Sequence, residues 1–185
     1  MGVAEESKGK LKQMLLEIRL AGHVSRGAPV EIFISYSHLD ADLAALLDTH
    51  LSALRREGLV ATWFDRQIGP GDRWRDAIDE RLERAALVLL LISANFIASD
   101  YCWDVELRRA MERHAAGQTR IIPVLLRDCD WQHLPFGAFQ AVPTGARPVT
   151  SWPDPHEAIA DVARSVRAAV LDLHRASPRP AQNTT

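Results

Sequence analysis

The sequence lacks the features that mark disulfide-rich, zinc-binding, secreted or membrane-spanning proteins. Its two cysteines, Cys102 and Cys129, form no CxxC pair, so neither a disulfide framework nor a metal site is expected. No apolar run approaches the ~20 residues that span a bilayer. The start, MGVAEESKGK, carries acidic residues in place of the apolar stretch of a secretory signal. We therefore expect a soluble, cytoplasmic protein.

Charge and short motifs point to neither nucleic acid nor the common nucleotide-binding folds. The 22 Lys and Arg residues nearly balance 24 Asp and Glu residues, for a net charge of −2, which gives no attraction to nucleic acid or anionic lipid. The segment GPGDRW lacks the GK[ST] of a P-loop, and GxGxxG, HExxH and GxSxG motifs are missing. A receiver domain is not expected either, because Ser93 follows the third predicted strand where a phosphoacceptor Asp would stand.

The length of 185 residues fits one domain with terminal extensions. We place an N-terminal helix and linker at 1–29, the domain at 30–175 and a polar tail at 176–185. The tail is typical of a linker to another domain or of a disordered end. The apolar spacing of an amphipathic helix is carried by Leu11, Met14, Leu15 and Ile18.

Strand and helix patterns alternate along the domain, which predicts an α/β fold with a parallel sheet. The apolar run Leu87 to Ile92 is typical of a strand covered on both faces, and Pro123 favours a sheet edge or bulge. With five strands, the flavodoxin-like order 2-1-3-4-5 is expected, with helices on both faces. Strands are predicted at 31–35, 59–64, 87–92, 121–126 and at Val149, and helices at 40–58, 74–82, 100–114 and 159–171.

The topology predicts where a ligand would bind. In open parallel sheets, ligands bind outside the carboxyl ends of the strands, where the strand order reverses, here between strands 1 and 3. The expected rim consists of Ser35 to Asp40, the neighbourhood of Asn95, and the Gly/Pro-rich loop from Asp65 to Asp72.

Glu106 is the most informative carboxylate in the chain. It lies on or beside the apolar stripe of the predicted helix 100–114. One interpretation is a solvated residue paired with Arg109 or Arg113. The other is a partly desolvated carboxylate that faces the strand ends and stabilises positive charge. The stripe is formed by Trp103, Leu107, Ala110 and Met111.

The segment after the first strand offers further candidates. Asp40 is expected to be the N-cap of the following helix. His38 is either a solvent-facing loop residue or, with Tyr36 and Ser37, part of an aromatic and hydrogen-bonding surface for a ligand.

Taken together, four blocks resemble the Toll/interleukin receptor (TIR) domain family, especially its bacterial members. The likeness covers about residues 30–172, and Pro123-Val124 fits the fourth strand of the family. The blocks are EIFISYS at 31–37, WFD at 63–65 with IGPGDRW at 68–74 (strand 2 and the BB loop), LVLLLIS at 87–93 and SDYCWDVEL at 99–107.

Many bacterial and plant members of this family are NAD+ glycohydrolases with a key glutamate, which by motif position is Glu106. The resemblance implies NAD+ as substrate and no cofactor. Many members have tryptophan four residues before the glutamate, where this chain has Cys102, with Tyr101 and Trp103 beside it. The expected substrate-binding residues are Ser35, Tyr36, Ser37, His38, Asp65, Arg66, Ile68, Gly71, Trp74, Asn95, Cys102 and Trp103.

A single glutamate suits this chemistry. Ordinary glycoside hydrolysis needs a second carboxyl group to protonate the leaving oxygen, whereas nicotinamide leaves NAD+ as a neutral ring. What remains is an oxocarbenium-like ribose that a carboxylate stabilises. Water as acceptor gives ADP-ribose, and an internal oxygen or nitrogen acceptor gives a cyclic isomer.

The resemblance also implies self-association, in which the BB loop (Asp65 to Trp74) of one chain completes the site of its neighbour. Such a head-to-tail contact forms open filaments, and a fused or separate sensor would trigger it in bacterial immune signalling. The main alternative is a non-enzymatic TIR adaptor that acts by protein–protein contacts alone. A third is a deoxyribosyltransferase-like enzyme, which the GPGDRW loop fits less well.

Overall fold

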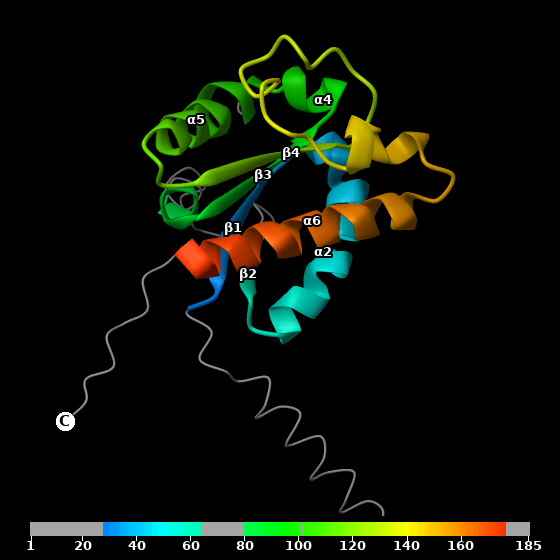
Figure 1. Cartoon of the computed structure of the whole chain (residues 1–185). Coiled ribbons are helices and arrows are strands. Elements are labelled where there is room, and N and C mark those ends of the chain that lie inside the picture. Colours follow the sequence, from blue (N-terminus) through cyan, green and yellow to red (C-terminus); the bar gives the residue numbers. More distant parts are fainter. Residues whose placement is uncertain (1–27, 64–79, 101, 177–185) are drawn as a thin grey trace, which may run out of the picture.

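The computed structural model describes residues 28–63, 80–100 and 102–176 (Figure 1). The helix expected near the N-terminus, the Asp65 to Trp74 loop and the residues after 176 lie outside these ranges. No helix among the described residues is both long enough and apolar enough to cross a membrane.

Four parallel strands form one sheet in the order β2-β1-β3-β4. They are β1 (Val30–Ser35), β2 (Val60–Trp63), β3 (Leu87–Ile92) and β4 (Arg120–Leu125). All six residues of β3 are buried, as expected for a central strand of a parallel sheet. Pro123 lies in β4, which is an outer strand of this sheet, so its prediction as an edge residue is confirmed.

The fifth strand predicted at Val149 is wrong for the residues that the structure describes. Val149–Ser151 is a short 3-10 helix, η5. Beyond β4 there is instead an isolated bridge between Val124 and Val142. An apolar residue such as Val149 is buried in either case, so burial alone did not distinguish the two structures.

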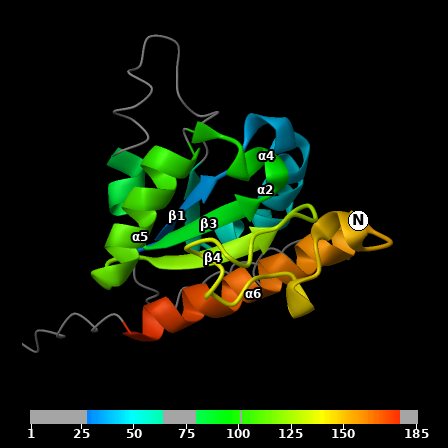
Figure 2. The same cartoon turned by 90° about the horizontal axis from the view of Figure 1, so that it is seen from above.

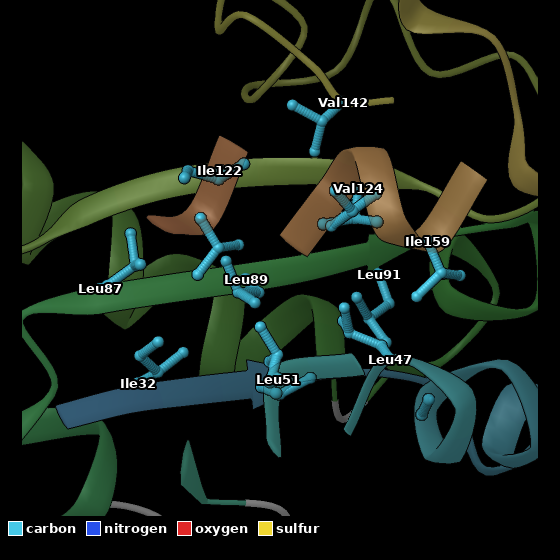
Figure 3. Close-up of a cluster of buried hydrophobic side chains, with 14 of the residues drawn as sticks. Ile32, Leu47, Leu51, Leu87, Leu89, Leu91, Ile122, Val124, Val142 and Ile159 are labelled. Carbon is cyan, nitrogen blue, oxygen red and sulfur yellow. The ribbon is translucent and has the colours of Figure 1, made fainter. Parts of the chain in front are cut away.

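Helices cover both faces of the sheet (Figures 1 and 2). On one face, α2 (Ala41–Arg56) and α6 (Pro155–Ala176) pack against the side chains of alternate strand residues, including Ile32, Leu89 and Val124 (Figure 3). Burial of each such aliphatic side chain stabilises the fold by about 1.5–3 kcal/mol. The predicted end of α2 is confirmed, since Gly58 follows it with φ +69°.

The opposite face is covered by α4 (Ala94–Ile97), the turn η3 (Cys102–Leu107) and α5 (Arg108–Ala115). The helix predicted from 100 to 114 therefore has two parts, and its first part, η3, is π-helical. The stretch around Asn95, predicted as a loop, is the helix α4, which the Ser93 hydroxyl caps by accepting a hydrogen bond from the Phe96 amide.

Candidate functional site

Glu106 lies in η3, against the carboxyl end of β1. Its side chain is 5% exposed, and it accepts a hydrogen bond through Oε2 from the hydroxyl of Ser35, which is 1% exposed. Ser35 is the last residue of β1 and faces the same side of the sheet as Phe33, because side chains alternate along a strand. That is the side covered by η3 and α5, so the strand end and the π-helical turn bring the two side chains together.

The π-helical geometry of η3 supports a functional assignment of this turn. Such turns are rare and occur frequently at functional sites. Cys102, four residues before Glu106, is buried, and its Sγ donates to the carbonyl oxygen of Tyr36 at 3.5 Å. Two residues of one turn thus contact two consecutive residues at the end of β1.

The interpretation of Glu106 as a solvated residue is wrong, because its side chain is buried. Of the arginines expected beside it, Arg109 bonds the exposed Glu83 and Glu112. The hydrogen bond from Arg109 lowers the pKa of Glu83. Arg113 is buried and donates to the backbone carbonyls of Leu82 and Ala85.

The segment after β1 makes a tight turn at the carboxyl edge of the sheet. Tyr36 and Ser37 are buried, and His38 is exposed and meets the Tyr36 ring edge-to-face at 6.1 Å between centroids. The Ser37 hydroxyl accepts from the Leu39 amide, and the Ser37 carbonyl accepts from the Asp40 amide at 2.8 Å. This turn leaves Leu39 74% exposed.

Asp40 ends this turn and has no exposed surface. It is the N-cap residue of α2, as predicted, but its side chain makes no capping hydrogen bond. Its carboxyl group accepts instead from the Ser93 hydroxyl, from Asn95 Nδ2 at 3.2 Å and from Arg127 Nε at 2.7 Å. These partners follow β3 and β4, so Asp40 connects the ends of three strands.

Arg127 is the residue of this edge that sequence reasoning missed. Its side chain is 40% exposed and also lies 3.9 Å from Asp42. A signal was present, because Arg127 closely follows the fourth strand, and the carboxyl ends of parallel strands meet at one edge.

The β4 end of this edge is acidic. Burial raises the pKa of the Cys129 thiol, and the negative charges of Asp128, Asp130 and Asp40 raise it further.

The structure brings together some of the predicted site residues. Ser35, Tyr36, Cys102 and Glu106 are in contact, and Ser37 and His38 continue the same turn. Asn95 lies instead against Asp40. Among the described residues, no three His, Cys, Asp or Glu side chains are grouped to hold a metal ion. Outside the described residues lie Asp65, Arg66, Ile68, Gly71, Trp74 and the Trp103 side chain.

Comparison with known families identifies the family of the chain. A family model for the TIR domain matches residues 32–159, which include Ser35, Glu106 and Arg127. This chain belongs to the TIR domain family. The four-stranded parallel sheet and the helices on both faces are therefore those of a TIR domain.

One curated protein is similar to most of this chain. The TIR domain is 48% identical over 149 residues to "Uncharacterized protein y4lF" of Sinorhizobium fredii, which covers 80% of this chain and 46% of that protein. The chain thus spans about half the length of this curated relative.

One solved structure shares the fold, and a second gives a lower structural similarity. The TIR domain of the Toll-related receptor TRR-2 from Hydra magnipapillata has a TM-score of 0.52 at 20% identity, over 78% of this chain and 97% of that one. The TIR domains of the activated Roq1 resistosome, which directly recognises the pathogen effector XopQ, have a TM-score of 0.47 at 16% identity, over 84% of this chain and 89% of that one.

Proposed function

We propose that this TIR domain cleaves the bond between nicotinamide and ribose in NAD+, with Glu106 as the catalytic residue. The supporting observation is the placement of the Glu106 carboxyl group. It is nearly buried at the carboxyl edge of the sheet, beside the end of β1, and it accepts a hydrogen bond from Ser35. A surface carboxylate has no need of such a position, whereas charge stabilisation is strongest where water is excluded.

The reaction needs one carboxylate. The bond between ribose C1′ and the nicotinamide nitrogen breaks, and its electron pair leaves with the ring and neutralises the ring's positive charge. Positive charge then develops on the ribose, where Glu106 stabilises it. A water oxygen bonds to C1′ and releases one proton, which gives ADP-ribose. An oxygen or the adenine nitrogen of the same ligand in place of water gives a cyclic isomer.

The charges at the sheet edge support one orientation of the substrate. Asp128 and Asp130 place negative charge near Cys129 at the β4 end, which disfavours the diphosphate there. We infer that the diphosphate extends toward the β2 side. Tyr36, Ser37 and His38 line the nicotinamide side, and Cys102 and Trp103 lie next to the ribose.

Activation by self-association is part of the proposal. Because the Glu106 side chain is only 5% exposed, a ribose reaches it only after neighbouring side chains move. A BB loop supplied by a second copy in a head-to-tail contact is one way to cause that movement. We propose that a fused or separate sensor triggers this assembly in the cytoplasm, as part of bacterial immune signalling.

The decisive test is a product assay on concentrated protein. We expect the wild-type chain to release nicotinamide from NAD+, and Glu106→Gln to lower the rate by about 10²–10³-fold, the loss typical for one charge-stabilising group. The matched control is Glu112→Gln, which changes an exposed carboxyl group of the next helix and should leave the rate unchanged. Nicotinamide release by Glu106→Gln at the wild-type rate would refute the catalytic assignment.

The adaptor alternative has its own outcome in this assay. An adaptor leaves NAD+ intact at every concentration and when it is artificially clustered. If clustered wild-type protein forms a stable assembly without releasing nicotinamide, the chain acts by protein–protein contacts and the enzymatic proposal is wrong.

A further inference from the structure

The hydrogen bond between Ser35 and Glu106 assigns a role to a residue that the sequence suggested as a substrate contact. We propose that Ser35 is a positioning residue, whose hydroxyl holds the Glu106 carboxylate in its productive orientation and does not touch the substrate. This inference rests on the proposed cleavage of NAD+ and names a second residue on which that reaction depends.

Burial and donor capacity support this role. Ser35 is 1% exposed, so a substrate has almost no access to its side chain. A serine hydroxyl has one proton to donate, and here that proton points to Glu106 Oε2. A buried carboxylate without hydrogen bonds is costly, so the Ser35 hydroxyl stabilises Glu106 in the place where the reaction needs it.

The backbone of Ser35 gives it a fixed position from which to act. Ser35 ends β1 and pairs in register with Leu90 of the buried central strand β3. Side chains along β1 are also held, since the Phe33 ring stacks on Trp63 of β2 with centroids 5.3 Å apart. The hydroxyl is therefore attached to one of the most constrained segments of the sheet.

The π-helical turn needs such a fixed partner. A π-helical turn departs from regular α-helical spacing, and contacts outside the turn help to set the direction of its side chains. Ser35 holds Glu106, and the Tyr36 carbonyl accepts from Cys102 one turn earlier. A carboxylate misplaced by about 1 Å can cost about 10²-fold in rate, so the loss of this contact should appear in kcat.

Steady-state kinetics on assembled protein test the role. We expect Ser35→Ala to lower kcat about 10- to 100-fold while KM for NAD+ stays within about 3-fold of the wild-type value. Ser35→Cys keeps the size of the side chain with a weaker donor, so its kcat should fall between those of serine and alanine. Thr49→Ala, which removes an exposed hydroxyl on α2, should leave kcat unchanged.

A double variant separates positioning from general damage to the fold. If Ser35 acts through Glu106, then Ser35→Ala combined with Glu106→Gln should be no slower than Glu106→Gln alone. Thermal unfolding of each variant verifies that it is folded.

Three outcomes would overturn the assignment: an unchanged kcat in Ser35→Ala, a raised KM with wild-type kcat, or additive losses in the double variant. These results leave the proposed function intact. A wild-type chain that never cleaves NAD+ refutes the proposed function itself, and the role of Ser35 with it, so the two failures are distinct.

Discussion

The buried carboxyl group of Asp40 connects segments that are far apart in the sequence. Its oxygens accept hydrogen bonds from side chains that follow β3 and β4, namely Ser93, Asn95 and Arg127. Arg127 is 40% exposed and can bond water instead, whereas the Ser93 hydroxyl is fully buried and has no such replacement. Asp40 therefore matters mainly through what its loss would leave behind.

We predict that Asp40→Ala lowers the free energy of unfolding by about 2–4 kcal/mol, because the buried Ser93 hydroxyl and the Asn95 amide lose their acceptor. Urea unfolding followed by circular dichroism measures the change. The control is Asp42→Ala, an exposed residue 3.9 Å from Arg127, whose loss should cost less than about 1 kcal/mol. Equal losses in the two variants would show that the buried contacts of Asp40 are unimportant.

Glu106 and Asp40 show what could be predicted at single residues. Glu106 was identified because a carboxylate beside an apolar helix stripe has a local signature, and its motif position agreed. Asp40 was correctly placed at the N-cap of α2, but an aspartate there ordinarily caps the helix with its side chain, and here the side chain bonds elsewhere. Its true partners lie 53 and 87 residues away for Ser93 and Arg127, and no local pattern reports such contacts.

At the scale of elements, Arg113 connects α5 to the segment that precedes β3. Arg113 is 6% exposed and donates to the carbonyls of Leu82 and Ala85, which precede β3. Burial lowers the pKa of its guanidinium. One side chain thus satisfies two buried carbonyls before β3 and holds α5, the continuation of η3, against them.

We predict that Arg113→Met lowers the free energy of unfolding by about 2–4 kcal/mol, because the aliphatic stem remains while two buried carbonyls lose their donor. The comparison is Arg109→Met, four residues earlier, which breaks an exposed pair with Glu83 and should cost much less. Chemical denaturation at low and high salt measures both. Added salt should weaken only the contribution of Arg109, and equal, salt-sensitive losses would contradict the buried role of Arg113.

The elements divide into those with a strong pattern and those without. The four strands were predicted because β-branched and leucine runs between turn signals have few other interpretations. The π-helical geometry of η3 was not, because the spacing of apolar residues cannot distinguish it from the α-helix into which it continues. Val149 was predicted as a strand because it is apolar. Its backbone instead forms the 3-10 helix η5, in the segment after the bridge at Val142.

At the scale of the whole molecule, the described residues form a sheet with two separate cores, and the proposed site lies at its carboxyl edge. The net charge of −2 produces little repulsion between copies. Leu39 projects 74% exposed from the turn next to Asp40. These properties are compatible with the self-association on which the proposed activity depends.

We predict that nicotinamide release per chain rises with protein concentration, because in the proposed mechanism a second copy opens access to the nearly buried Glu106. Rates measured over a range of concentrations, together with mass from light scattering, relate activity to assembly. Trp74→Ala in the BB loop should lower both the assembled mass and the rate while thermal unfolding stays close to wild type. A rate per chain that is constant with concentration, or a Trp74→Ala protein that assembles normally, would refute assembly through this loop and leave Glu106 to act within a single chain.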